Sequence, residues 1–360
     1  MTGNARTRGS ALRAALALSV MALAGVGSGA LAQQNRNGSQ EVEGLSQRAS
    51  QGKVEILHVQ GNVYMISGAG ANITVQVGDE VVIAVDSGVA QRSDEVLAAI
   101  RSVTDKHILF IINTSADEDH TGGNENLSKA GWALPNTARS PLQKQGEERY
   151  QMAPGASIVA HYNVLEKMSA PTGKQPASPS GLWPTDTYDT RYWRLYNDEG
   201  VWMYHPPTAH TDGDSYVIFR KSDVVSTGDI LTLASYPVIR ADQGGSIDGI
   251  VAALNQIIEF LEPRANEEGG TYVIPGHGHV CDRHDVVDYR DMLTIIRGRI
   301  QYFIKQGMTL EQVKAAKPTL DYDGLYGATT GPWTSDMFVE AIYRELSKNK
   351  TQAQKVDGDR

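Results

Sequence analysis

The chain has 360 residues, of which 33 are Lys or Arg and 42 are Asp or Glu, so its formal net charge at pH 7 is −9. Hydrophobic residues make up 41% and charged residues 21% of the sequence, a globular composition that argues against disorder, collagen-like repeats and a disulfide scaffold. Surfaces that bind nucleic acid are normally basic, so the acidic balance argues against a nucleic-acid partner.

The N-terminal segment has the pattern of a secretory signal. Arg6, Arg8 and Arg13 precede a short apolar run from Ala14 to Val26, and Ala30-Leu31-Ala32 then matches a small-x-small cleavage site. The alternative is an uncleaved helical anchor, but the apolar run is shorter than the roughly 20 residues that a membrane-spanning helix needs.

We therefore expect a signal peptide over residues 1–32 and a polar leader over residues 33–51. After cleavage the protein would have no integral membrane segment, and it would be periplasmic or secreted. In such an oxidising compartment the lone Cys281 has no internal partner for a disulfide.

Short β-rich runs separated by glycine-containing turns come next. They predict a meander of antiparallel strands at Val54–Val59, Val63–Ser67, Ile73–Val77 and Val81–Val85. Ser93–Val103 is predicted as a helix, with Asp94 and Glu95 in the first turn, where they favour the positive end of the helix dipole. The apolar run Ile108–Ile112 predicts a strand buried on both faces, and a helix is predicted again from Gly122 to Ala130.

The second half of the chain repeats this style. It predicts strands at Ser157–Ala160, Tyr192–Leu195, Val201–Tyr204, Tyr216–Arg220, Val224–Ser226 and Tyr272–Ile274. The residues from Ser169 to Asp189 are rich in Pro, Ser, Thr and Gly and predict a long loop. Apolar residues at helical spacing predict a helix at Ile247–Leu261, and the chain closes with helices at Asp285 to about Lys305, Leu310–Ala316 and Ser335–Leu346.

Runs of strands followed by helices, twice over, predict two packed sheets with helices outside. The fold class is therefore α/β, with a four-layer αββα sandwich over residues 52–290 and a C-terminal helical tail over residues 291–360. A doubly wound parallel sheet is disfavoured, because the strands come in consecutive meanders instead of alternating with helices.

Acids and imidazoles cluster at the ends of several predicted strands. They are Asp86, Asp117, Asp119, His120, His210, Asp229 and His277. If these side chains meet at one edge of the sheets, they offer oxygen and nitrogen ligands, which suit zinc, iron or manganese better than a soft thiolate site would.

Five short motifs around these residues resemble those of the metallo-beta-lactamase superfamily. They are Val85-Asp86-Ser87-Gly88, Asp119-His120-Thr121-Gly122-Gly123-Asn124, Ala209-His210-Thr211-Asp212-Gly213-Asp214-Ser215, Ser226-Thr227-Gly228-Asp229 and Ile274-Pro275-Gly276-His277-Gly278. The motifs occur in the family's order, and the resemblance covers about residues 54–280.

The resemblance implies a site with two metal pockets. The first pocket in this family is held by the two His of an H-x-H-x-D-H stretch and by a third His, which corresponds to His210. The second pocket is held by the Asp and the last His of that stretch and by a final His, which are here Asp119, His120 and His277. Asp229 takes the bridging position between the pockets.

This chain departs from the family pattern in the first pocket. Ser115 and Asp117 occupy the positions of the two first-pocket His. A neutral hydroxyl is a poor ligand, whereas Asp117 offers an anionic oxygen of different reach. We therefore expect one firmly held zinc in the second pocket and a weak or absent second metal at Asp117, His210 and Asp229, with iron or manganese as alternatives. Asp86 matches a family position that supports the site from behind.

The leading hypothesis is a metal-dependent hydrolase acting on a small-molecule substrate. Attack by metal-bound hydroxide would cleave an ester, amide, lactam or phosphoester, with Asp117 and His210 as candidate catalytic residues. A catalytically degenerate metal- or ligand-binding module and a mononuclear iron oxygenase of the same fold remain open. The sequence predicts no oligomeric state.

Several residues near these motifs are expected to have structural roles and not to bind metal. The carboxylates of Asp212 and Asp214 are expected to bond within their own turn and not to metal, and His161 is expected to be structural. Cys281 is expected to be a small buried residue. The Trp and Tyr residues between positions 183 and 204 are read as cross-strand packing, with an apolar substrate wall as the alternative.

Overall fold

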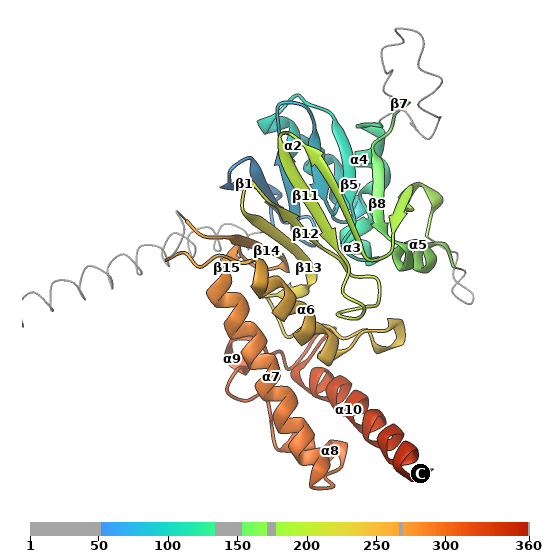
Figure 1. Ribbon diagram of the computed structural model, residues 1–360, viewed down its shortest axis with the longest axis vertical. Coiled ribbons are helices and arrows are strands. Elements are labelled where there is room, and N and C mark those ends of the chain that lie inside the picture. The colour runs from blue at the N-terminus through green and yellow to red at the C-terminus, as the bar shows by residue number, and fades with distance from the viewer. Residues whose placement is uncertain (1–51, 134–152, 171–177, 266–268, 359–360) are drawn as a thin grey trace, which may run out of the picture. The chain divides into compact units, whose positions relative to one another are not determined.

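The structure is a computed structural model that describes residues 52–133, 153–170, 178–265 and 269–358 (Figure 1). The expected signal peptide and polar leader lie outside these residues. Within the described ranges, none of the helices combines the length and the hydropathy needed to cross a membrane.

Seven strands form the first sheet, in the order β1-β2-β3-β4-β5-β8-β9. Their bounds are β1 Glu55–Gln60, β2 Val63–Ser67, β3 Ile73–Val77, β4 Val82–Val85, β5 Ile108–Ile112, β8 Ser157–His161 and β9 Asp186–Tyr188. The first four strands pair antiparallel, as a meander does, and β4, β5, β8 and β9 pair parallel.

Six strands form the second sheet, in the order β10-β11-β12-β13-β14-β15. Their bounds are β10 Arg191–Tyr196, β11 Glu199–Tyr204, β12 Tyr216–Phe219, β13 Val224–Thr232, β14 Tyr272–His277 and β15 Cys281–Asp282. Only the β13–β14 pair of this sheet is parallel. Two short strands, β6 (Trp132–Ala133) and β7 (Ala153–Pro154), pair with each other.

The helices connect and flank these sheets. Their bounds are α2 Ser93–Val103, α3 Glu118–Thr121, α4 Asn124–Lys129, α5 Tyr162–Ser169, α6 Ile247–Phe260, α7 Arg283–Lys305, α8 Leu310–Ala315, α9 Asp323–Tyr326 and α10 Ser335–Gly358. Short 3-10 turns lie at Ala90–Arg92, Ser180–Leu182 and Ala241–Gln243. In Figure 1, α7 runs beside α6 and α10.

Alternating side chains divide the core into layers. In β2, Met65 packs between the two sheets with Phe219 of the second sheet, whereas its neighbour Ile66 packs outward with Ile100 of α2. A larger cluster joins the outer face of the second sheet to α6, α7 and α10, with Phe338 among its buried members. These layers form the αββα sandwich, so the predicted fold class is confirmed.

The predicted boundary between residues 290 and 291 falls inside α7. The division of the chain into a domain and a C-terminal helical tail stays a prediction.

Several elements differ from the sequence prediction, and three of them have a local reason. The helix α5 begins after His161, whose Nδ1 accepts the N–H of Asn163, so it has none of the usual N-cap residues that would mark its start. The described part of the predicted loop 169–189 contains β9, which pairs with β8. β13 continues past its predicted end, because Gly228, with a φ of 51°, lets the strand shift register and go on.

Candidate metal centre

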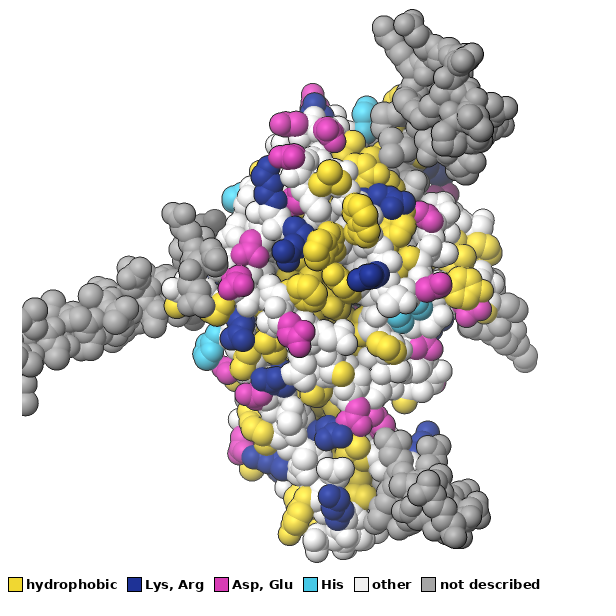
Figure 2. All heavy atoms as spheres, viewed as in Figure 1, with side chains coloured by type: hydrophobic (Ala, Val, Ile, Leu, Met, Phe, Trp, Pro, Cys, Tyr) yellow, Lys and Arg dark blue, Asp and Glu magenta, His cyan; other side chains and the backbone are white. Residues whose placement is uncertain are grey.

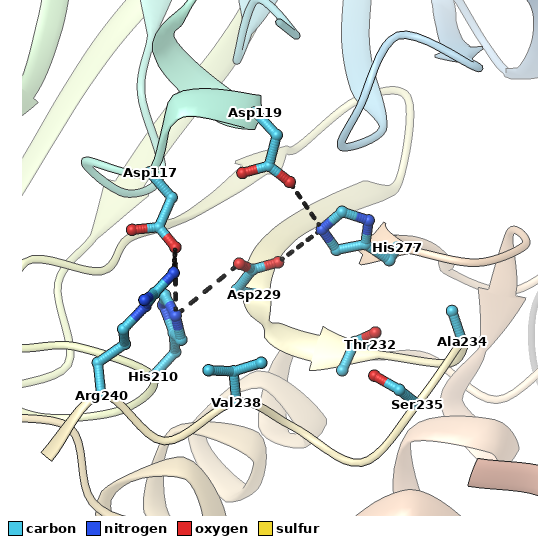
Figure 3. A pocket seen from close by; sticks show the side chains of 10 residues that line it. All are labelled: Asp117, Asp119, His210, Asp229, Thr232, Ala234, Ser235, Val238, Arg240 and His277. Carbon is cyan, nitrogen blue, oxygen red and sulfur yellow. Dashed lines mark hydrogen bonds and ion pairs between the residues drawn. The ribbon is translucent and has the colours of Figure 1, made fainter. Parts of the chain in front are cut away.

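Acids and imidazoles from four parts of the chain meet at one end of the two sheets. Two groups have ligand atoms that all lie within 4.8 Å of one another, and they are Asp119, His120 and His277, and Asp117, His210 and Asp229. Figure 3 shows Asp119 and His277 on one side of the pocket, Asp117 and His210 on the other, and Asp229 between them. The folded chain therefore brings together every metal ligand that the sequence predicted.

Local folding explains how each side chain reaches this place. Asp119 and His120 lie in the short helix α3, which follows the buried strand β5. His210 lies in the connection between β11 and β12, and His277 ends β14. Asp229 was expected to follow its strand, but it lies within the extended β13.

The second pocket is the more complete of the two. His277 Nε2 lies 3.2 Å from Asp119 Oδ2 and 3.4 Å from Asp229 Oδ1. His120 Nε2 lies 3.3 Å from Asp229 Oδ2. Two imidazole nitrogens and two carboxylates thus face a common point, a donor set that suits zinc or another transition metal.

Three buried polar atoms in the site make no hydrogen bond within the described part of the chain. They are Nε2 of His120, Nε2 of His210 and Oδ1 of Asp229. Leaving a buried polar atom without a hydrogen-bond partner costs free energy, and native structures rarely do so. A metal ion in the second pocket would satisfy the atoms of His120 and Asp229, so the donor set of that pocket fits a metal.

Asp86 orients His120 from behind. Its Oδ2 lies 2.8 Å from Nδ1 of His120 and accepts the hydroxyl of Thr114 at 2.6 Å, while its Oδ1 accepts the Thr114 N–H at 2.8 Å. This leaves Nε2 of His120 aimed into the pocket. Asp86 therefore lies where the resemblance places it, outside the ligand set.

Asp214 holds His210 in a similar way. Its Oδ1 lies 3.4 Å from Nδ1 of His210, and its carboxylate accepts the N–H and the hydroxyl of Thr211, both at 2.7 Å. The prediction that Asp214 bonds within its own turn is confirmed. The same prediction is wrong for Asp212, whose carboxylate pairs with the more distant Lys167.

The first pocket holds an unexpected cation. Asp117 stands at the N-cap of α3, yet its side chain makes no capping bond. Instead, Arg240 Nη2 donates to Asp117 Oδ2 at 2.8 Å, and the same oxygen lies 3.6 Å from His210 Nε2. Ser115 is fully buried, and its hydroxyl accepts the N–H of Asp117 at 3.3 Å.

Buried charges shift the pKa values of the site. Burial by itself lowers the pKa of His120, but Asp229 and Asp86 raise it well above its ordinary value. Burial opposes ionisation of Asp229, yet the neighbouring imidazoles, His120 first, lower its pKa. For His277, burial is likewise outweighed by the hydrogen bond to Asp119, which raises its pKa. In the metal-free protein, protons therefore compete with a metal for the imidazoles.

A cavity of about 300 Å³ opens beside these groups (Figure 3). Besides the candidate ligands, it is lined by Thr232, Ala234, Ser235, Val238 and Arg240. The sequence pointed to none of these five. Thr232 ends β13 and the other four lie on the segment after it, which only the fold brings to the site.

Other residues of interest lie away from the cavity. His161 stacks on His205 with ring centroids 3.5 Å apart, and Cys281 is buried, which raises the pKa of its thiol. The lining, as far as the structure describes it, includes no Trp or Tyr, and Tyr204 stacks on Tyr216 across strands. Figure 2 shows apolar side chains gathered over the second sheet, and Trp193 on its edge strand β10 is 65% exposed.

Comparison with known proteins shows the family of this chain and supports its fold. A family model described as the metallo-beta-lactamase superfamily matches residues 66–277. A search of curated proteins finds no match. Among solved structures, the sec-alkylsulfatase Pisa1 from Pseudomonas sp. is 14% identical with a TM-score of 0.57, over 81% of this chain and 50% of that chain.

Two further solved structures are similar to this chain. A double mutant of the same sulfatase is 13% identical with a TM-score of 0.58, over 81% and 50% of the two chains. DIM-1 metallo-beta-lactamase is 18% identical with a TM-score of 0.48, over 67% and 97%. This chain thus spans about half the length of the alkylsulfatases, and at such identities the likeness concerns the fold alone.

Proposed function

The chain belongs to the metallo-beta-lactamase superfamily, and we propose that it is a hydrolase that works with one metal ion held in the second pocket. The observation that carries the proposal is the set of unpartnered buried atoms, Nε2 of His120 and Oδ1 of Asp229 above all, beside the imidazole of His277. Those atoms are oriented for a ligand that no described side chain supplies.

Zinc is the metal we propose, with iron or manganese as alternatives, because the donors are imidazole nitrogens and carboxylate oxygens. A zinc ion in such a site supplies an activated water at neutral pH. Asp119, His120, Asp229 and His277 would hold the ion, and Asp86 would keep His120 in the orientation that binds it.

The chain's own residues would then handle the substrate and its protons. Asp117 and His210 line the cavity beside the second pocket. We propose His210 for proton transfer, joined by Asp117 where its pair with Arg240 opens. The hydroxyl groups of Thr232 and Ser235 line the same cavity. A cavity of about 300 Å³ suits a small substrate, and we propose an ester, amide, lactam or phosphoester. From the N-terminal pattern we also propose that the protein works in the periplasm or is secreted.

One observation favours a second candidate function, a metal-binding module without catalysis. Arg240 is paired with Asp117, the residue that would otherwise act as base. If that pair is permanent, proton transfer depends on His210 alone.

The test begins with metal-free protein to which zinc, iron(II) or manganese(II) is added separately. The panel of substrates should hold a carboxylic ester, an amide, a lactam, a phosphoester and, because the fold neighbours include alkylsulfatases, an alkyl sulfate. We expect hydrolysis of at least one substrate that depends on the added metal. Metal binding without any turnover would favour the module, and oxygen consumption with iron would favour the oxygenase.

Matched variants test the pocket assignment. Replacing His120 or His277 by Ala removes a ligand of the second pocket, so most of the bound metal should be lost. Ser115→Ala removes a hydroxyl whose bond is to a backbone N–H, so the metal content should stay close to that of the native protein. Equal metal loss from all three variants, measured by elemental analysis, would contradict the assignment.

A further inference from the structure

Arg240 is fixed beside the first pocket by its own backbone. Its N–H donates to the carbonyl of His210 at 3.0 Å, and its carbonyl accepts the N–H groups of Gln243 and Gly245, both at 2.8 Å. The segment that carries Arg240 is therefore attached to the same residue that supplies the imidazole of the pocket.

The side chain of Arg240 reaches the oxygen that a metal in this pocket would use. Nη2 of Arg240 donates to Asp117 Oδ2 at 2.8 Å, and that oxygen faces His210 Nε2 at 3.6 Å. Figure 3 shows the guanidinium group of Arg240 directly below the carboxylate of Asp117 and beside the imidazole of His210. An ion bound between Asp117 and His210 through this oxygen, the one that faces the imidazole, would have to share it with the guanidinium.

We propose that Arg240 takes the place of the metal ion in the first pocket. This inference rests on the proposed function, since it explains why only one metal is held. A guanidinium stays protonated at any pH at which proteins fold, so Arg240 is a permanent cation. Two cations at one carboxylate repel each other, and the repulsion is strong where burial lowers the dielectric constant. Arg240 therefore neutralises Asp117 and keeps a second divalent ion out.

The departure from the family pattern at position 117, an Asp in place of a His, agrees with the replacement of a metal ion by Arg240. An imidazole at position 117 would be neutral and could not form an ion pair with a guanidinium. The Asp found there can. Its carboxylate is only 14% exposed, although the side chain of Arg240 is 42% exposed, so water is kept from the Asp117 side of the pair. The carboxylate at position 117 and the arginine at position 240 thus act together as one ion pair, although they lie far apart in the sequence.

The experiment counts zinc ions per chain in the full-length protein after dialysis against a weak chelator. Arg240→Met removes the cation and keeps a long side chain, and Arg240→Gln does the same with a polar group. Arg299→Met is the matched control, because Arg299 also pairs with an Asp and has a similar exposure, 37% against 42% for Arg240. Circular dichroism reports whether each variant is folded.

We expect about one zinc in the native protein, in Arg299→Met and in Arg240→Lys, which keeps a cation. Arg240→Met and Arg240→Gln should bind about two, and the further change Asp117→Asn should return each of them to about one. One zinc in folded Arg240→Met and Arg240→Gln would overturn the inference and leave the proposed function standing. Two zincs in the native protein would overturn the inference and also the one-metal part of the proposed function. No zinc in any variant would instead contradict the proposed function itself.

Discussion

Asp86 gives the clearest test of how a residue outside the ligand set controls the site. Asp86→Asn keeps the shape of the side chain but removes the charge that faces Nδ1 of His120. Loss of such an outer partner typically weakens metal binding by about 10- to 100-fold. We expect a loss in that range for zinc, measured by competition with a coloured chelator.

The control for this variant is Asp223→Asn. Asp223 also has a positive φ, 53° against 66° for Asp86, and its carboxylate accepts the hydroxyl of Thr271 outside both candidate metal groups. Its replacement should leave zinc affinity unchanged. An Asp86→Asn protein that binds zinc as tightly as the control would show that Asp86 does not act on the metal.

The sequence identified the acids and imidazoles that meet at the site, but not the residues that pair with them. His120, His277 and Asp229 could be recognised because each stands in a short motif next to a predicted strand. Arg240 stands in no such motif, and nothing local separates it from the other 32 Lys and Arg residues of the chain. Its role depends on a loop that folds back to the carbonyl of His210, which is a long-range contact.

The sequence predicted the bounds of strands and helices most accurately where a local pattern was complete. The bounds of β2, β3, β5 and α2 match the prediction residue for residue, because their apolar periodicity is bounded by polar or glycine residues. The strand β9 was missed because it has three residues and depends on pairing with β8, which a propensity argument does not include. The helix α5 was missed because its cap is a histidine.

That histidine makes the protein sensitive to acid. Burial, and then the stacked His205, lower the pKa of His161 to about 4 from an ordinary 6.5. Between these values the unfolded chain binds more protons than the folded one, so the free energy of unfolding falls as the pH falls through this range. At about 1.4 kcal/mol per pKa unit, the contribution of His161 is at most about 3 kcal/mol.

His161→Asn should reduce this sensitivity. Asn has no titrating group and is a good N-cap, so α5 keeps an acceptor for the N–H of Asn163. Urea unfolding of the metal-free protein at about pH 7 and about pH 4.5 measures the loss of stability, which should be smaller in His161→Asn than in the native protein. The exposed His58 provides the control variant His58→Asn, which should lose as much stability between the two pH values as the native protein does. Equal losses in all three proteins would contradict the assigned role.

At the scale of the whole molecule, the C-terminal helices support the loop that lines the cavity. The hydroxyl of Tyr236 donates to the carbonyl of Thr319 at 3.1 Å and lies 3.0 Å from a carboxylate oxygen of Asp323. Its ring stacks on Phe338 of α10 with centroids 4.7 Å apart. Because Tyr236 lies in the same loop as Arg240, the helices beyond residue 290 are part of what positions the site.

The same helices also fix the start of α6. Glu345 of α10 accepts the hydroxyl of Ser246 at 2.7 Å and the N–H of Ile247 at 2.9 Å, so it completes the cap of that helix. The sequence predicted these C-terminal helices but not their role, since a helical pattern shows that a face is buried and not what it packs against.

Zinc-edge anomalous diffraction from crystals grown with zinc would locate the metal in one pocket or the other. We expect one strong anomalous peak, surrounded by Asp119, His120, Asp229 and His277, with the guanidinium of Arg240 still on Asp117. A strong peak between Asp117 and His210, with Arg240 displaced, would contradict this expectation.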